Sequence, residues 1–187
     1  MIRYVKELNE SIWSLAETRV KELPIYKNSH REVEANQVGV LGEIVTELWL
    51  SHLQIPYLDQ KITTHDYLLT KVDKRLEVKT KDRTVVPFSD YDCSVPLYNH
   101  EHQIPDYYLF ISLLRNKRFE GNNIRRFQRA YILGVSDQSL LHTLGVIWKK
   151  GQTDTDNGTT FWTDCINLKI HQLIPLDSVS ELWNPKN

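Results

Sequence analysis

The segment that decides the fold lies at residues 65–83 and has the sequence HDYLLTKVDKRLEVKTKDR. Its first part, Asp66–Thr70, is a short strand candidate, and Lys71–Lys74 is a polar turn. The stretch Arg75–Thr80 alternates between polar and apolar residues, the pattern of a strand with one buried face. We therefore predict a β-hairpin whose two strands are joined by the polar turn.

The second strand of this hairpin carries an acid and a lysine on one face. Side chains two apart on a strand share a face, so Glu77 and Lys79 lie side by side while Leu76 and Val78 point to the core. Asp66, at the start of the first strand, comes near Glu77 if the pairing contains a stagger or a bulge. Two neighbouring carboxylates repel by ~4 kcal/mol at an effective dielectric of 20, and a bound divalent cation compensates. Hard oxygen ligands favour Mg²⁺ or Mn²⁺.

Asp66, Glu77 and Lys79 together resemble the motif of the PD-(D/E)XK nuclease superfamily, which has the restriction-endonuclease-like fold. In that motif an Asp begins one strand, and an acid and a Lys separated by one residue follow on the next. The resemblance implies a Mg²⁺-dependent deoxyribonuclease, with Mn²⁺ able to substitute. Asp66 and Glu77 would bind the metal, and Lys79 would assist the attacking water. The resemblance also implies DNA as the partner and a phage, mobile-element or restriction-type enzyme. His65 stands where the superfamily name has a proline.

Many members of that superfamily carry a further Glu on the preceding helix, often within a Gly-Glu pair, and Gly42-Glu43 matches this pattern. The resemblance thus implies that Glu43 is a catalytic residue and a third metal ligand; the alternative is an ordinary exposed glutamate. Gly39 and Gly42 lie about one turn apart, and each costs about 1 kcal/mol inside a helix. This pair predicts that one face of the helix packs closely on the sheet that carries Glu77.

Hydrophobic periodicity extends the fold outward from the hairpin. Apolar residues three and four apart predict helices at Tyr4–Leu23 and Asn36–Leu53, with Asn36 as an N-cap. The apolar run Tyr107–Leu114 predicts a strand that is buried on both faces. Further expectations are an irregular stretch at Asp82–His102, a strand at Ala130–Val135, a helix at Asp137–Leu144 and a segment at Thr159–Ile170 that closes the sheet. We therefore expect one α/β nuclease domain over residues 1–187, with a central mixed sheet flanked by helices.

Basic residues gather in two places. Lys81 and Arg83 follow Lys79 on the predicted strand. The second group brackets the turn at residues 120–123 and consists of Arg115, Lys117, Arg118, Arg125, Arg126 and Arg129. Phosphate contacts are the natural use for so much arginine, so we predict that both groups bind DNA. The alternative for the second group is a solvated loop.

Composition limits the class of protein. The net charge of −1 argues against a protein that coats DNA, whereas an enzyme needs only a local basic track. Two distant cysteines favour neither a disulfide framework nor a zinc knuckle. No apolar run approaches the ~20 residues of a membrane helix, and the first residues lack the apolar block of a signal peptide. We expect no membrane partner and a cytoplasmic location in a bacterial or phage-infected cell. A homodimer would suit cleavage of both DNA strands.

Other interpretations stay open. The chain could be a nucleic-acid-binding protein on the same fold whose site is catalytically silent, or a protein that is no nuclease and carries a chance motif. His100-Glu101-His102 has metal-binding residue types, but without further ligands we interpret it as a surface loop. Gln103 and Tyr107 have the spacing of a helical Gln-xxx-Tyr element in one branch of the superfamily. Pro105 lies between them and argues against that helix.

Overall fold

The computed structural model describes residues 4–23, 32–62, 64–97, 103–119 and 123–185. In chain order its elements are β1 (Tyr4–Glu7), α1 (Glu10–Glu22), α2 (Glu32–His52), β2 (Tyr57–Ile62), β3 (His65–Leu69), β4 (Lys74–Arg83), β5 (Asp92–Pro96), β6 (Tyr107–Arg115), the 3₁₀ turn η2 (Ile124–Arg126), β7 (Phe127–Asp137), α3 (Gln138–Leu144), β8 (Val146–Trp148), β9 (Cys165–Lys169), the 3₁₀ turn η3 (Ile170–Gln172) and α4 (Leu176–Trp183). The chain thus has an α/β fold, as the sequence predicts.

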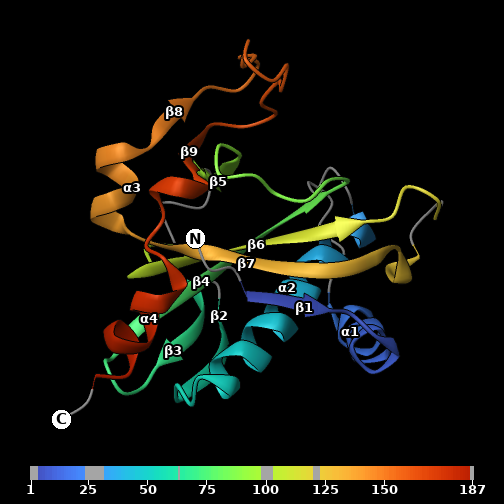
Figure 1. Cartoon of the computed structure of the whole chain (residues 1–187), viewed down its shortest axis with the longest axis vertical. Helices are drawn as coiled ribbons and strands as arrows, with labels where there is room; N and C mark the ends of the chain where they lie inside the picture. The colour runs from blue at the N-terminus through green and yellow to red at the C-terminus, as the bar shows by residue number, and fades with distance from the viewer. Residues whose placement is uncertain (1–3, 24–31, 63, 98–102, 120–122, 186–187) are drawn as a thin grey trace.

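A mixed sheet of six strands forms the centre of the molecule (Figure 1). Its strand order is β1-β7-β6-β4-β3-β2. Strands β4 and β6 run parallel, and every other neighbouring pair in this sheet is antiparallel. The predicted central mixed sheet is therefore confirmed, and so is the hairpin of β3 and β4.

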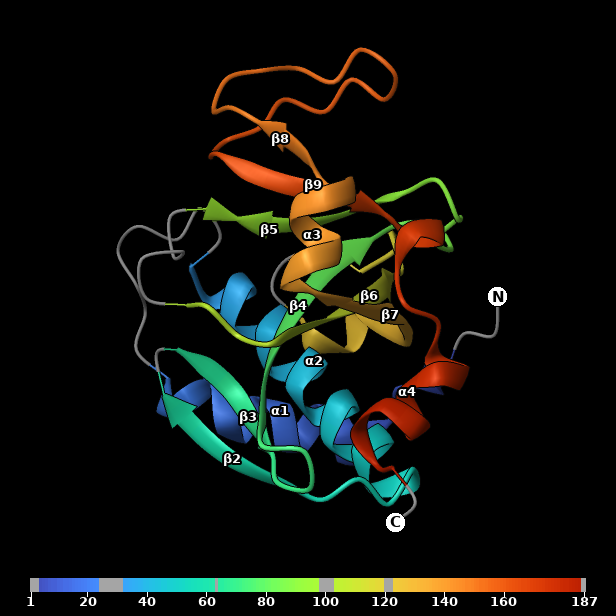
Figure 2. The same ribbon diagram turned by 90° about the vertical axis from the view of Figure 1, so that its left-hand side faces the viewer.

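The six-stranded sheet is covered on both faces (Figures 1 and 2). Helices α1 and α2 lie on one face, and the small sheet β5-β9-β8 with α3 lies on the other. Two apolar clusters match these two faces. Leu109 and Ile111 of β6 belong to the cluster with α1, α2 and α4, whereas Tyr108 and Phe110 belong to the cluster with β5 and β9. Strand β6 is therefore buried on both sides, which explains its nearly continuous apolar sequence.

The N-terminal prediction needs a correction. The segment predicted as a helix at Tyr4–Leu23 begins with strand β1, and α1 starts only at Glu10. Strand β1 pairs with β7 from Tyr4↔Ile132 to Glu7↔Arg129, so a partner far along the chain overrides the local helical periodicity. Asn9 then caps α1, because its Oδ1 accepts a hydrogen bond from the backbone N–H of Ile12 at 3.2 Å.

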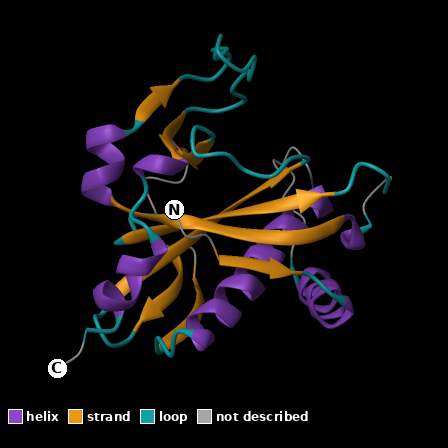
Figure 3. Cartoon of the chain, viewed as in Figure 1, coloured by secondary structure: helices purple, strands orange, loops and turns teal. Residues whose placement is uncertain are grey.

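Three other predictions differ from the structure. Helix α2 begins at Glu32, so Asn36 lies inside it and is not its N-cap. The stretch predicted as irregular contains strand β5 at Asp92–Pro96. The segment at 159–170 contributes β9 to the three-stranded sheet and does not close the central one. Figure 3 shows these strands above the central sheet. Among the described residues, no helix has the length and apolar character needed to span a membrane.

Candidate active site

The register of the β3–β4 hairpin brings two acids to adjacent strands. The pairing runs Leu69↔Lys74, Leu68↔Arg75 and Tyr67↔Leu76, and one further step along both strands sets Asp66 opposite Glu77. No bulge interrupts this ladder, so the stagger considered from the sequence is unnecessary. Residues directly opposite on antiparallel strands share a face. The plain register itself therefore carries Asp66 toward Glu77.

The Asp66 carboxylate is fixed by the backbone of the neighbouring strand. Its Oδ2 accepts a hydrogen bond from the N–H of Val78 at 2.7 Å, just beyond Tyr67↔Leu76, the last backbone pair of the ladder. Burial and, after it, the charge of Glu77 raise the pKa of Asp66, the Val78 hydrogen bond acts in the opposite direction, and the resulting pKa is about 8. Without a cation, Asp66 thus holds its proton near neutral pH.

Glu77 is buried, with 5% of its surface exposed, and its two oxygens differ. Oε1 accepts a hydrogen bond from Lys79 Nζ at 2.7 Å. Oε2 is buried and has no hydrogen-bond partner. A buried carboxylate oxygen without a partner is costly, and a hard cation is one group that would satisfy it.

Lys79 lies between an acid and an amide. Besides Glu77, its Nζ donates to Oε1 of Gln103 at 3.3 Å. Gln103 precedes β6, and its place in this site was not predicted, because the loop that carries it shows no periodicity. The Tyr107 ring instead packs on Trp183 at 5.6 Å between centroids, so the two residues of the Gln-xxx-Tyr spacing have separate roles.

The glycine prediction holds for one of the two positions. A Cβ on Gly42 would lie 1.8 Å from Oγ1 of Thr80, so helix α2 rests directly on β4 there. A Cβ on Gly39 would meet nothing within 4 Å. Close approach of α2 to the strand that carries Glu77 is confirmed at Gly42 and is wrong at Gly39.

Glu43 lies near the pair, and its role as a third ligand stays a prediction. Its charge is among the causes that raise the pKa of Asp66, after burial and Glu77. Its carbonyl oxygen accepts a hydrogen bond from the Tyr67 hydroxyl at 3.3 Å. Over the part of the chain that the structure describes, no group of three or more His, Cys, Asp or Glu side chains is placed to hold a metal ion. The described residues bring together Asp66, Glu77 and Lys79, with the charge of Glu43 near enough to act on Asp66.

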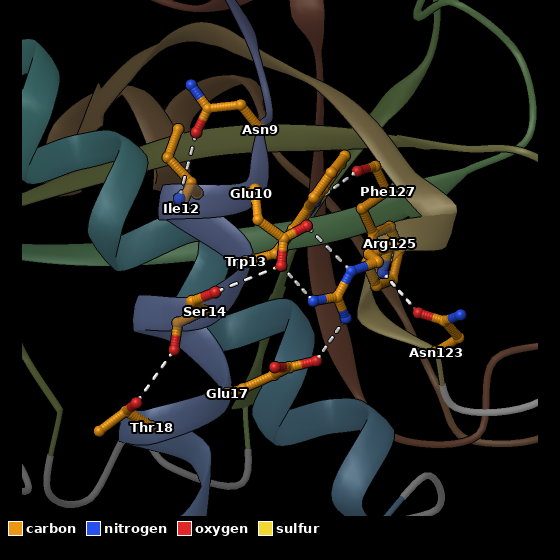
Figure 4. Close-up of polar contacts among 10 residues, drawn as sticks. All are labelled: Asn9, Glu10, Ile12, Trp13, Ser14, Glu17, Thr18, Asn123, Arg125 and Phe127. Atoms are coloured by element: carbon orange, nitrogen blue, oxygen red, sulfur yellow. Dashed lines mark hydrogen bonds and ion pairs between the residues drawn. The ribbon is translucent and has the colours of Figure 1, made fainter.

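The second basic group is engaged mainly in ion pairs within the protein. Arg125 pairs with Glu10 and with Glu17 of α1, the latter at 2.8 Å (Figure 4). Arg129 pairs with Glu7 at 2.5 Å, and Arg115 with Asp82 at 3.5 Å. These three arginines join neighbouring elements of the fold.

Arg126 requires a correction as a DNA contact. Its side chain is only 3% exposed and forms an ion pair with Glu34 at 2.9 Å. A guanidinium in that position cannot reach a phosphate. Lys117 and Arg118, by contrast, lie on the surface after β6. The His100-Glu101-His102 segment lies outside the described residues.

Lys81 and Arg83 continue the row that begins with Glu77 and Lys79. The Lys81 side chain is partly exposed to solvent, but protein atoms surround its ammonium group. This desolvation lowers the pKa of Lys81, and the charge of Arg83 lowers it further. Arg83 donates from Nη2 to the carbonyl oxygen of Asp92 at 2.6 Å and lies over the Tyr91 ring.

Comparisons with protein-family models, curated proteins and solved structures found no significant match to this chain.

Proposed function

We propose that this chain is a metal-dependent deoxyribonuclease whose fold is of the restriction-endonuclease-like type. The observation that carries the proposal is the meeting of Asp66 and Glu77 on adjacent strands, with the Lys79 ammonium 2.7 Å from Glu77. Structural ion pairs do not need a second buried acid, whereas cation sites in phosphodiester hydrolases do. The resemblance of these residues to the PD-(D/E)XK motif adds the substrate class.

The donor set fits a hard divalent cation. Asp66 and Glu77 supply carboxylate oxygens, and Glu77 Oε2 is a buried acceptor without a hydrogen-bond partner. Two protein carboxylates suit Mg²⁺, which keeps several waters and adds phosphate oxygens of the substrate. When bound there, the ion supplies a water of lowered pKa and neutralises charge on the phosphate.

Side chains of the protein would position the attacking water and the DNA backbone. Lys79 donates a hydrogen bond from the same face as the acids, so its ammonium can orient the attacking water or stabilise negative charge that develops on the phosphate. Gln103 holds Lys79 from the other side at 3.3 Å, which keeps its ammonium in place while substrate enters. Lys81 and Arg83 extend the positive charge along β4, where the DNA backbone would bind.

Cleavage of supercoiled plasmid and of single-stranded DNA in Mg²⁺ or Mn²⁺ tests the proposal. We expect cleavage by the wild type and a loss of about 10²-fold or more in Lys79→Ala and in Glu77→Gln. Lys21→Ala, at an exposed position of α1, is the matched control and should cleave normally. RNA of the same sequence tests the choice of DNA.

The second candidate is a nucleic-acid-binding protein of the same fold with a silent site. The observation that favours it is that, in the described part of the chain, only two acids meet at the candidate centre and no group of three does. This candidate predicts DNA retention at low salt without cleavage above the level of Lys79→Ala. If DNA is neither retained nor cut, both candidates fall.

A further inference from the structure

A pocket of about 300 Å³ opens between the two sheets, directly beside the candidate active site. One wall is β4, which contributes Lys79, Lys81 and Arg83. The segment 159–163, which precedes β9, also lines the pocket and contributes Trp162. Lys79 belongs to both the pocket and the acidic centre, so a molecule in the pocket lies next to the proposed reacting group.

The lining combines three cationic side chains with an apolar floor, and its one acid, Asp92, forms an ion pair with Lys169 at 2.9 Å. Phe110 of β6 and Leu133 of β7 form part of the floor. Both side chains belong to the buried cluster between the sheets. Positive charge on one side and apolar surface beneath is the combination that single-stranded nucleic acid uses, with phosphates on the cations and bases on flat apolar groups.

Trp162 is held on an ordered platform at the edge of this pocket. Its side chain is 52% exposed, the most exposed large aromatic group of the lining. The preceding residue, Phe161, stacks on Trp148 with centroids 4.8 Å apart. Backbone hydrogen bonds from Gly151 to Phe161 and from Phe161 to Gln152 close this loop as a hairpin. The ring of Trp162 is therefore presented from a fixed backbone.

Two cationic groups of the positive wall reach the pocket, and one of them has a donor without a partner. Arg83 is anchored by its bond to Asp92 and by the Tyr91 ring, while its Nε–H is buried and has no hydrogen-bond partner. Lys81 reaches the same pocket from the neighbouring position of that face. A preorganised guanidinium such as that of Arg83 binds phosphate at a lower entropic cost than a flexible side chain does.

We infer that this pocket receives one unpaired base of the DNA strand that is cut, stacked on Trp162, with its flanking phosphates on Lys81 and Arg83. The inference rests on the proposed function and narrows its substrate to single-stranded or locally unpaired DNA. A volume of about 300 Å³ holds a single base, whereas stacked base pairs do not enter it.

The pocket is suited to any of the four bases. Its polar lining includes the hydroxyls of Ser94, Thr159 and Thr163, which can both donate and accept hydrogen bonds. Stacking on an indole ring is likewise tolerant of sequence. The pocket thus selects DNA whose bases are unpaired, because pulling a base out of an intact duplex costs unstacking and unpairing energy.

Binding without metal tests the inference separately from cleavage. Single-stranded oligonucleotides with one 2-aminopurine, and their duplexes, are titrated with protein in EDTA. The wild type should bind the single strand more tightly and quench the 2-aminopurine fluorescence by stacking. Trp162→Ala should weaken single-strand binding by about 5- to 100-fold in Kd and change duplex binding little.

Three further variants sharpen the result. Trp162→Phe keeps an aromatic ring and should retain most of the affinity. Ser94→Leu places a larger apolar side chain in the pocket, keeps Trp162 in the sequence and should abolish the preference for single strands. Ile147→Ala removes an apolar side chain of the same small sheet that is 57% exposed and does not line the pocket, so it should bind as the wild type does.

The outcomes separate the two proposals. If Trp162→Ala and Ser94→Leu bind single strands as tightly as the wild type, the pocket does not hold a base and the inference is overturned. If the wild type cuts no DNA but its binding depends on Trp162 as described, the nuclease proposal falls and the base pocket stands. Should Trp162→Ala fail to fold, Ser94→Leu still decides.

Discussion

The backbone N–H of Val78 donates a hydrogen bond to Oδ2 of Asp66 at 2.7 Å, at the point where strands β3 and β4 stop pairing through their backbones. A side chain thus takes over a hydrogen bond of the sheet. The consequence is that the Asp66 carboxylate is immobilised opposite Glu77. Two acids fixed in this way repel each other, and that repulsion gives the candidate site its measurable properties.

The first prediction concerns stability and pH without metal. The pKa of Asp66 is about 8 in the folded protein, because of burial and then Glu77, and near 3.8 when exposed. The folded state therefore binds the proton more tightly, and the stability this adds below about pH 4 is lost as the pH rises through about 8. In Asp66→Asn the free energy of unfolding should depend less steeply on pH than in the wild type, by up to about 1.4 kcal/mol per pH unit in that window.

Urea unfolding in EDTA between pH 4 and 9 measures this effect. Asp90→Asn, at an exposed carboxylate, is the control and should keep the wild-type pH dependence. A wild type and an Asp66→Asn variant with parallel curves would mean that Asp66 is not buried beside Glu77.

The second prediction compares two glycines of helix α2. Gly42→Ala places a methyl group 1.8 Å from Oγ1 of Thr80, and overpacking of this kind costs about 1–3 kcal/mol. Gly39→Ala meets nothing within 4 Å and should stabilise the helix by up to about 1 kcal/mol. Thr80→Ala should rescue part of the loss in Gly42→Ala. Thermal unfolding checks the opposite signs, and equal shifts in both variants would refute the close approach of α2 to β4.

The third prediction separates buried from exposed arginines. Arg126→Ala leaves Glu34 without its partner and should destabilise the protein by about 3 kcal/mol. Arg129→Ala breaks an exposed pair with Glu7 and should change the free energy of unfolding much less. Chemical denaturation measures both. If Arg126→Ala changed the free energy of unfolding little but weakened DNA binding, Arg126 would be a DNA contact after all.

The fourth prediction concerns the salt dependence of DNA binding. If Lys81 binds one phosphate, Lys81→Ala should weaken binding at low salt for every sequence and reduce the slope of log K against log salt by about 1. Lys149→Ala is the control, because Lys149 lies outside the pocket and pairs with Asp164 at 2.9 Å. Fluorescence anisotropy over a salt series gives both slopes. An unchanged slope in Lys81→Ala would remove Lys81 from the interface.

How well a feature of this protein can be predicted from its sequence depends on how far apart in the chain the interacting residues lie. The β3–β4 hairpin and the face shared by Glu77 and Lys79 are local features, and alternation over a few residues reveals them. Strand β1 was missed because its partner β7 lies more than a hundred residues away and contributes nothing to the local pattern. The approach of Gln103 to Lys79 is also hidden, because Gln103 lies in a loop without periodicity, 24 residues along the chain.

Charge patterns were the least reliable guide. Six cations around one turn suggested a DNA surface, but Arg125 and Arg126 are held by acids of α1 and α2 that the sequence places far away. Residue type alone cannot distinguish an arginine that binds phosphate from one that pairs with a carboxylate of the same protein. The pocket wall with Trp162 likewise depends on a sheet that forms between distant segments.

The most direct test of the central claim is a crystal structure of the protein soaked in Mn²⁺, with anomalous diffraction data. The account predicts an anomalous peak bound by carboxylate oxygens of Asp66 and Glu77, beside Lys79, and its loss in Glu77→Gln. Crystals of a folded wild type that show no peak between these two acids at saturating Mn²⁺, or a peak that persists unchanged in Glu77→Gln, would contradict it.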